Sequence, residues 1–254
     1  MGTAGNESPV PATAVLAAAA DDVIASAAAT GITLRLLGGI AVFQLAPSAR
    51  MPPLARPYHD FDVVVPARQG QSAAEIFRRL GYAEDAHFNA LHGAQRMVFT
   101  ASSGFVVDLL VGTFQMCHRL HLGRDLPTSG STIHPADLLL TKLQIVQIEE
   151  KDLLDTAALL VDLPPARSAP GIEIGRFVAP LASDWGFFHT VELNLPRVAA
   201  FAADRLGNAE AQRVERGVQE LRRAMDAAPK SLRWRARARI GERVPWYELP
   251  EEIG

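Results

Sequence analysis

The sequence predicts an α+β fold, with a small mixed sheet and flanking helices followed by a mostly helical C-terminal part. Two observations support this prediction. Over the first 130 residues, short β-branched or apolar runs alternate with helical patterns, in the order strand, helix, loop, strand, helix and two strands. Beyond residue 130 the pattern is mostly helical. We therefore expect an α/β core at residues 1–130 and a helical domain with a basic tail at residues 131–254.

The first predicted elements lead into a pair of glycines. Residues 13–30 are alanine-rich and predict a helix, which Thr13 can cap at its start. Residues 33–37 form a short apolar run typical of a strand, and this run continues directly into Gly38-Gly39. Residues 40–45 then predict the first turns of a second helix. A strand–turn–helix unit is therefore expected around the glycines.

Prolines and apolar runs define the rest of the first part. Four prolines between residues 47 and 57 predict a loop without a regular ladder of hydrogen bonds. The β-branched run after this loop predicts a buried strand, which Pro66 ends. The expected elements are a strand at 61–65, a helix at 72–80, and a hairpin with strands at 96–100 and 105–111.

The second part is expected to be a set of helices joined by short turns. A long apolar segment opens after His134-Pro135, and Gly207-Asn208 predicts a turn between two later helices. The expected helices lie at 136–148, from about 152 to just before Pro164, at 195–206 and at 210–227, with a linker or loop at 165–170.

Composition excludes several classes of protein. The 254 residues are 48% hydrophobic and 21% charged, which excludes a disordered chain, a collagen and a coiled-coil rod. Asp21 and Asp22 interrupt the longest alanine-rich run, so a membrane span is not expected. The single cysteine, Cys117, can form neither an internal disulfide nor a cysteine-rich zinc site, and it predicts a reducing, cytoplasmic location. The net charge of −3 indicates no nucleic-acid partner by itself.

Three carboxylates indicate a metal site. Asp60 and Asp62 are two residues apart on a predicted strand, so both side chains project from the same face. Asp108 lies within an apolar strand, where a carboxylate needs compensation. Three such carboxylates brought together would suit Mg²⁺, which prefers hard oxygen ligands. The alternative is that Asp60 and Asp62 are surface charges at a strand end and that Asp108 is a buried salt-bridge partner.

Phosphate-binding candidates lie close to these carboxylates in the sequence. Gly38 and Gly39 join a strand to a helix, where bare backbone N–H groups and the helix N-terminus can hold a phosphate. Arg56 precedes Asp60 by four residues and can meet a phosphate or orient a carboxylate. A Gly-Gly turn without a ligand is the alternative for the glycines.

Several motifs together resemble a known family. Residues 36–41 (Leu-Leu-Gly-Gly-Ile-Ala), 56–63 (Arg-Pro-Tyr-His-Asp-Phe-Asp-Val) and 107–109 (Val-Asp-Leu) resemble the polymerase-β type of nucleotidyltransferase fold. Residues 134–143 and the Lys-Asp-Leu-Leu-Asp run at 151–155 are similar to the AbiEii-type nucleotidyltransferases, which include toxins of type IV toxin–antitoxin systems. The resemblance covers residues 33 to about 160.

This resemblance implies a set of roles. It implies Asp60, Asp62 and Asp108 as catalytic ligands of Mg²⁺ or Mn²⁺, an NTP as substrate, and Lys142 as a cation directed at the triphosphate. From the residues alone, Lys142 can equally be a lysine whose stem covers the edge of the core. Likewise, Lys151 and Asp155 can be a surface pair four residues apart, and Asp152 a helix cap.

Basic residues are concentrated in the tail. Residues 222–243 carry eight positive charges against Asp226 and Glu242. Between residues 233 and 239 four arginines alternate with other residues, so a strand would place them all on one face and could hold RNA phosphates. A solvated helix with arginines paired to Glu248, Glu251 and Glu252 is the alternative. His118 and His121 beside Cys117 make at most a partial metal site, and polar members of a helix or loop over the sheet are the preferred interpretation.

The sequence therefore predicts an enzyme that transfers NMP from an NTP to an acceptor and releases pyrophosphate. The acceptor can be an RNA such as tRNA, a protein hydroxyl or a small molecule such as an aminoglycoside, and a cognate antitoxin is a further candidate partner. The alternative is a protein on the same fold that binds a nucleotide or a partner without turnover. All three carboxylates are present, which favours the enzyme, because a pure binding module need not bear their mutual repulsion.

Overall fold

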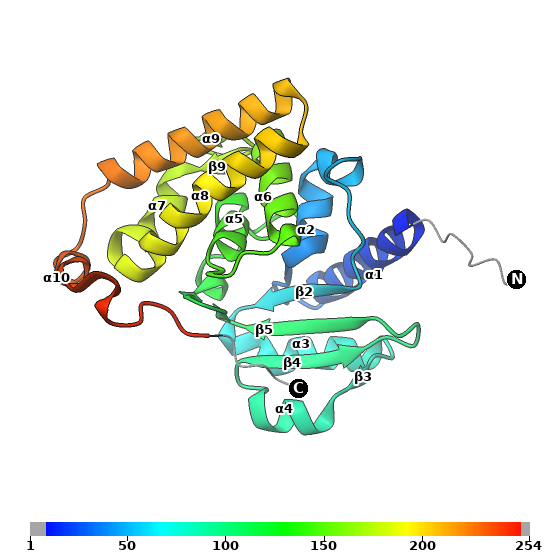
Figure 1. Cartoon of the computed structure of the whole chain (residues 1–254). Coiled ribbons are helices and arrows are strands. Elements are labelled where there is room, and N and C mark those ends of the chain that lie inside the picture. The colour runs from blue at the N-terminus through cyan, green and yellow to red at the C-terminus, as the bar shows by residue number, and fades with distance from the viewer. Residues whose placement is uncertain (1–8, 250–254) are drawn as a thin grey trace, which may run out of the picture.

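A five-stranded mixed sheet organises the first part of the chain (Figure 1). The structure is a computed structural model and describes residues 9–249. The two central strands are parallel and every other neighbouring pair is antiparallel, so the predicted α+β class with a small mixed sheet is confirmed. In spatial order the strands are β1 (Arg35–Leu37), β2 (Asp60–Val65), β5 (Val106–Val111), β4 (Arg96–Thr100) and β3 (Ala83–Glu84).

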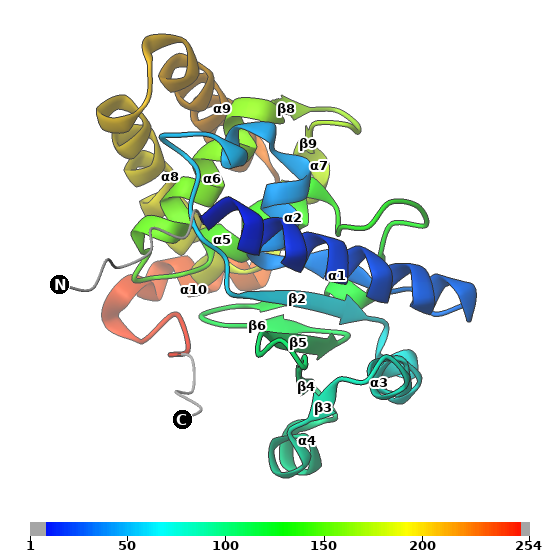
Figure 2. The same ribbon diagram turned by 90° about the vertical axis from the view of Figure 1, so that its right-hand side faces the viewer.

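Helices accompany this sheet on both sides. Figure 2 shows α1 running along the sheet beside β2. Thr13 is buried inside α1, so the expectation that it caps this helix is wrong. The prediction also missed α4, which begins where the Asp85 carboxylate accepts a 2.9 Å hydrogen bond from the Phe88 N–H. The helices of this part are α1 (Pro9–Ala29), α2 (Gly38–Leu45), α3 (Gly70–Arg79) and α4 (Ala86–His92).

The second part is helical, as expected, but the helices differ in their limits. The segment predicted as one helix at 136–148 ends at Leu143, and a helix at 174–183 was not predicted. The helix expected from residue 195 begins ten residues earlier, because Asp184 caps it there and Pro196 is accommodated inside it. The helices are α5 (Pro135–Leu143), α6 (Glu150–Asp162), α7 (Ile174–Ser183), α8 (Trp185–Arg205), α9 (Asn208–Ala227) and α10 (Leu232–Ile240).

Short elements complete the fold. One small antiparallel pair follows β5 directly and borders the site described below, and a small parallel pair lies where residues 165–170 were expected to be a linker or loop. These are β6 (Phe114–Gln115) with β7 (Arg119–Leu120), and β8 (Pro165–Ala166) with β9 (Ile172–Glu173). Single 3₁₀ turns lie at Pro47–Arg50, Ala67–Gln69, Leu122–Arg124 and Gly241–Arg243.

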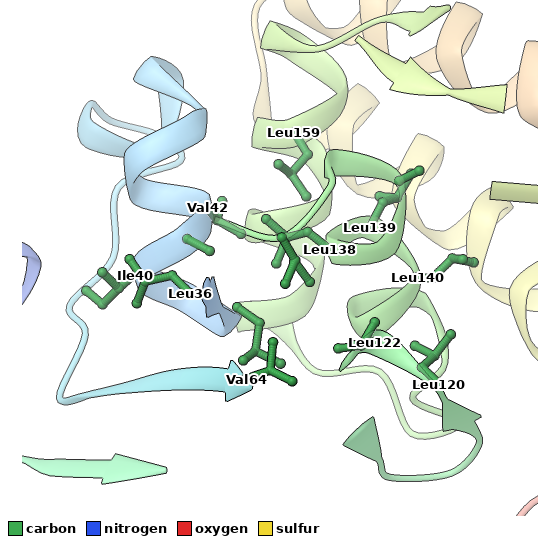
Figure 3. Close-up of a cluster of buried hydrophobic side chains, with 14 of the residues drawn as sticks. Leu36, Ile40, Val42, Val64, Leu120, Leu122, Leu138, Leu139, Leu140 and Leu159 are labelled. Atoms are coloured by element: carbon green, nitrogen blue, oxygen red, sulfur yellow. The ribbon is translucent and has the colours of Figure 1, made fainter. Parts of the chain in front are cut away.

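A continuous apolar core joins the sheet to the C-terminal helices. In Figure 3, Val42 of α2 lies close to Leu138 of α5 and Leu159 of α6, Val64 of β2 lies below Leu138, and Ile40 lies on the side of α2 away from α5. All five side chains are fully buried, and each such burial stabilises the fold by roughly 1.5–3 kcal/mol. The core therefore fixes α2 and α5 against the sheet. The expected domain boundary at residue 130 stays a prediction.

Within residues 9–249, no helix combines the length and the apolar character that crossing a bilayer requires.

Candidate functional site

The acidic cluster, Asp60, Asp62 and Asp108, lies on one face of the central parallel strands. Asp62 of β2 stands directly opposite Asp108 of β5, and Asp60 stands opposite Val106. Opposed residues on neighbouring strands share a face, and so do residues two apart on one strand. All three carboxylates therefore point to the same side of the sheet, where they line one cleft of about 800 Å³ together with Gly38 and Lys142.

Asp62 is the centre of the cluster. Burial, together with the neighbouring carboxylates of Asp108 and Asp60, raises the pKa of Asp62 to about 7. Lys142 and Arg96 oppose this rise without cancelling it. The raised pKa shows that the surroundings of Asp62 compensate its negative charge poorly. This is expected where three carboxylates lie together with too few cations.

Arg96, which the sequence analysis did not single out, binds Asp108 with both sides of its guanidinium. Arg96 Nε lies 2.8 Å from Asp108 Oδ1, and Nη2 lies 2.9 Å from Oδ2. Arg96 stands opposite Leu110 in the hairpin, so it shares a face with Asp108 and reaches it diagonally. Asp108 is therefore a salt-bridge partner, and the register of the hairpin is the signal that identifies Arg96 as the other partner.

The donor set of the acidic cluster suits a hard divalent cation. Three carboxylates share one face, and Arg96 is the cation bonded to them within the described residues. However, no three His, Cys, Asp or Glu side chains among residues 9–249 already stand in an arrangement that holds a metal ion. Both oxygens of Asp108 are engaged by Arg96. The three carboxylates are therefore suitable ligands for a divalent cation, but Asp108 is bonded to Arg96 in this structure.

The N-terminus of α2 adjoins the carboxylates. Gly38 has a φ of +68°, a left-handed conformation that favours glycine, and a Cβ there would collide with the Asp62 carboxylate. A Cβ at Gly39 would strike the Tyr58 ring and lie 2.8 Å from Arg56 Nη2. The side chain of Leu37 does not cap the helix. The two glycines therefore allow the start of α2 to approach Asp62, and Gly38 itself lines the cleft.

A second charged cluster, which we call the Asp155 network, lies beside the cleft. Asp155 is 1% exposed and accepts bonds from Arg56 Nε and Nη2 at 2.8 and 2.7 Å. Lys142 Nζ lies 2.8 Å from Asp155 Oδ2 and 3.6 Å from Asp152 Oδ1. The Tyr58 hydroxyl donates to Asp155 Oδ1 at 3.3 Å, and the Arg56 guanidinium lies over the Tyr58 ring, 4.0 Å from its centroid.

The contacts within the Asp155 network distinguish between the roles that the sequence left open for Lys142 and Asp155. Asp155 is buried, so it does not form a surface pair with Lys151, which instead contacts Glu149 at 2.8 Å. Lys142 is held between two carboxylates at the edge of the cleft, and these partners raise its pKa although burial alone would lower it. The guanidinium of Arg56 is engaged by Asp155, and Arg56 is not among the residues that line the cleft. Its predicted role in binding phosphate is untested.

The basic tail forms a helix, so of the two alternatives for residues 233–239 the strand with four arginines on one face is wrong and the helix is correct. Residues two apart on a helix lie nearly opposite each other, and α10 therefore divides the arginines into two pairs. Arg237 donates to backbone carbonyls at the end of the tail and lies over the Trp185 ring, 4.8 Å from its centroid. Arg235 and Arg239 are exposed. Of the partners proposed for these arginines, Glu248 bonds to Gln115, whereas Glu251 and Glu252 lie outside the described residues.

A second hollow, of about 1030 Å³, lies between the β6–β7 hairpin, α7, α8 and the tail. It shares Gln115 and Cys117 with the wall of the carboxylate cleft, so the two spaces are neighbours. His118 is stacked on Phe187 at 5.0 Å between ring centroids, and it bonds to Thr190 Oγ1 at 2.8 Å. Burial lowers the pKa of His118 to about 4. His118 is thus a buried polar residue of the β6–β7 turn that packs against α8.

The chain was also compared with known proteins. No protein-family model and no curated protein matches its sequence. The solution structure of the antibiotic-resistance factor ANT(2'')-Ia is similar at a TM-score of 0.40 and 11% identity, over 75% of this chain and 97% of that one. The crystal structure of an antigenic nucleotidyltransferase-like protein from Paracoccidioides brasiliensis is similar at a TM-score of 0.39 and 14% identity, over 86% of this chain and 94% of that one. The likeness is distant, so we base the function on the geometry of the cleft.

Proposed function

We propose that the protein is a nucleotidyltransferase that uses Mg²⁺ or Mn²⁺ to transfer NMP from an NTP to an acceptor hydroxyl. The observation that carries this proposal is the register of the central strands, which sets Asp62 opposite Asp108 with Asp60 on the same face, beside the glycine start of α2. Carboxylates that repel one another next to a phosphate-binding helix start are what a metal–triphosphate complex requires.

Each residue has a role in this proposal. Asp60, Asp62 and Asp108 hold the metal, which when bound offsets the negative charge of the triphosphate and orients it. The backbone of Gly38 and Gly39 binds phosphate oxygens, and Lys142 offsets the charge that develops on them. Arg56, predicted from the sequence as a phosphate ligand, here acts through Asp155, which positions Lys142.

The transfer is a substitution at the α-phosphorus of the NTP. The acceptor oxygen forms a bond to this phosphorus while the bond from the phosphorus to the bridging oxygen of the β-phosphate breaks, and pyrophosphate leaves with the bonding electron pair. The acceptor hydroxyl gives its proton to the carboxylate of Asp108. The reaction is thus balanced without any redox partner.

The geometry favours a small-molecule acceptor among the three classes considered. The residues that line the carboxylate cleft include none of the arginines of residues 222–243, so RNA loses the feature that suggested it. The neighbouring hollow between β6–β7, α7 and α8 offers room for a small acceptor beside the cleft. The proposal also includes the predictions made from the sequence resemblance. These are an AbiEii-type toxin role, a cognate antitoxin as partner and a cytoplasmic location.

The test is transfer of label from each of the four α-³²P NTPs, with Mg²⁺, to total tRNA, to cell-lysate protein or to a small-molecule extract. We expect the small-molecule extract to be labelled, and Asp62→Asn to reduce labelling by more than about 100-fold. Asp204→Asn, which changes an exposed carboxylate at the end of α8, is the matched control and should label normally.

The main alternative is a protein that binds nucleotide without turnover. It predicts an NTP-dependent rise in melting temperature with Mg²⁺, lost in Asp62→Asn, but no labelled product from any acceptor pool. A rise that survives in Asp62→Asn would contradict both versions, because the nucleotide would then bind elsewhere.

A further inference from the structure

We propose that Arg96 is an exchangeable counter-ion, which pairs with Asp108 when the cleft is empty and with the triphosphate when metal and NTP are bound. This inference rests on the proposed function and adds a substrate-binding residue that the sequence motifs do not include.

The first step of the argument is competition for Asp108. The guanidinium of Arg96 engages both carboxylate oxygens, at 2.8 and 2.9 Å. A divalent cation needs at least one of the same oxygens, and its positive charge repels the guanidinium. Arg96 and the metal therefore cannot both hold Asp108 in full, and loading the metal must loosen or break this ion pair.

The second step is that this ion pair can be broken at little cost. The side chains of Arg96 and Asp108 are 39% and 16% exposed, whereas those of Lys142 and Asp155 in the neighbouring network are 12% and 1% exposed. A guanidinium with this exposure is solvated again when it leaves its partner, so the pair contributes little net stability. Arg96 is thus more exchangeable than Lys142, which lines the same cleft.

The third step is that Arg96 has somewhere to go. It lines the same cleft as Asp60, Asp62 and Lys142, which is where the proposed function places the triphosphate. Its guanidinium also lies 5.5 Å from the centroid of the Phe88 ring of α4. Asn89 fastens α4 to β4 through hydrogen bonds with the N–H and C=O of Val98, at 2.7 and 3.2 Å. Phe88 therefore supports Arg96 from one side while the guanidinium turns from the carboxylate to a phosphate oxygen.

The fourth step is charge balance. Three carboxylates with one arginine carry a formal charge of −2 when all are ionised, which one divalent cation neutralises. The metal takes the place of Arg96 at Asp108, so Arg96 is released from this carboxylate at the moment when the negatively charged triphosphate enters. Transfer of Arg96 to a phosphate oxygen therefore leaves Arg96 itself with a negatively charged partner in both the empty and the loaded state.

The test measures Mn²⁺ binding to the full-length protein by electron paramagnetic resonance, first without nucleotide and then with a non-hydrolysable NTP analogue. The variant is Arg96→Met, which keeps an unbranched side chain next to Phe88. Without nucleotide it should bind Mn²⁺ on the order of tenfold more tightly than wild type, because the competitor is gone. With Mn²⁺ present it should bind the analogue on the order of tenfold more weakly.

The matched control is Arg78→Met. Arg78 is 40% exposed and bonds to Glu84 through Nε and Nη2 at 3.1 and 2.7 Å, so it resembles Arg96 in exposure and pairing but lies outside the cleft. Both affinities should be unchanged in this variant. Arg96→Lys, a cation without the two-sided fork, should have an intermediate Mn²⁺ affinity, and melting curves in EDTA establish that each variant is folded.

Two results would overturn the proposal. Unchanged or weaker Mn²⁺ binding in Arg96→Met means that Arg96 supports Asp108 as a ligand and does not compete for it. Unchanged analogue binding means that Arg96 does not reach the phosphates. Failure of the proposed function looks different, because then wild type and all variants, including Arg78→Met, bind neither Mn²⁺ nor the analogue.

Discussion

The two charged clusters at the carboxylate cleft are built from the same kinds of residue and differ in their balance. The Asp155 network combines two carboxylates, Asp152 and Asp155, with two cations, Arg56 and Lys142. The acidic cluster combines three carboxylates with one cation, Arg96. The pKa values move in opposite directions: burial alone would raise that of Asp155, but Lys142 and Arg56 hold it below its usual range, whereas that of Asp62 rises to about 7.

This difference separates a structural role from the proposed functional one. In the Asp155 network every charge is used within the network, and its members come from the loop before β2, from α5 and from α6, so it fastens the sheet to the helices. The acidic cluster keeps an uncompensated negative charge at the wall of a cleft, which costs stability unless a ligand is bound. Lys142 belongs to the balanced network but also lines that cleft, and under the proposed function the network thereby positions a cation for the triphosphate.

The largest expected effect comes from breaking the balanced network. Asp155→Ala leaves two buried cations short of a partner, so we expect it to lower the free energy of unfolding by about 3–5 kcal/mol. Urea denaturation measures this loss. Asp152→Ala is the comparison variant and should lose clearly less, because Lys142 keeps its closer contact with Asp155. Equal losses in the two variants would contradict the central place of Asp155.

The acidic cluster should respond in the opposite direction, and only as the pH rises. The folded-state pKa of Asp62 lies above the value of the unfolded chain, so its contribution to stability is full below about pH 4 and is lost as pH rises towards 7. In EDTA, Asp62→Asn should therefore become more stable than wild type over this range, by at most about 4 kcal/mol at pH 7. Thermal or urea unfolding at several pH values measures the gap.

The control for this comparison is Asp204→Asn, which removes one negative charge at an exposed position outside the cleft. A constant difference between Asp62→Asn and wild type from pH 4 to 7 would mean that Asp62 is not the strained member of the cluster.

A smaller effect is expected at Arg56, and it tests whether this residue serves Asp155 or the phosphates. Arg56→Lys replaces a two-sided contact by a single one and should cost about 1.5–3 kcal/mol of stability. The NTP affinity should change less than threefold, because Arg56 does not line the cleft. Isothermal titration with NTP and Mg²⁺ measures the affinity. The control is Arg50→Lys, because the Arg50 side chain forms hydrogen bonds only with backbone carbonyls. A loss of NTP affinity above tenfold would restore the phosphate role predicted from the sequence.

The sequence predicts what local patterns control. The alternation of Asp60 and Asp62 along a strand, the hairpin that carries Asp108 and the glycine start of α2 all follow from spacing and turn chemistry. The partners of these residues are set by packing over long stretches of chain, as between Arg56 and Asp155, which are 99 residues apart. Arg96 is intermediate, since the turn at residues 101–105 fixes a register that pairs it diagonally with Asp108.

The tail shows how the choice between two periodicities changes a functional conclusion. Read as a strand, residues 233–239 present four arginines on one face and suggest RNA; folded as α10, they form two pairs on different sides. Arg233 lines the second hollow, and Arg237 holds the carbonyls of Val244 and Pro245. Arg237 is therefore in use within the protein, while Arg235 and Arg239 form an exposed pair on the other side of α10.

The smallest effect is accordingly expected from reversing the charge of that exposed pair, Arg235 and Arg239. Their double replacement by Glu should change the free energy of unfolding by no more than about 0.5 kcal/mol, because Arg235 bonds only to the Lys230 carbonyl and both side chains are solvated. The proposed transfer to a small acceptor should also proceed at the wild-type rate and depend little on salt between 50 and 200 mM. The double replacement of Arg213 and Arg216 by Glu, on exposed positions of α9, is the control for net charge. If RNA is the acceptor instead, the rate should fall steeply with salt, and the α10 variant should lose RNA binding while the α9 variant keeps it.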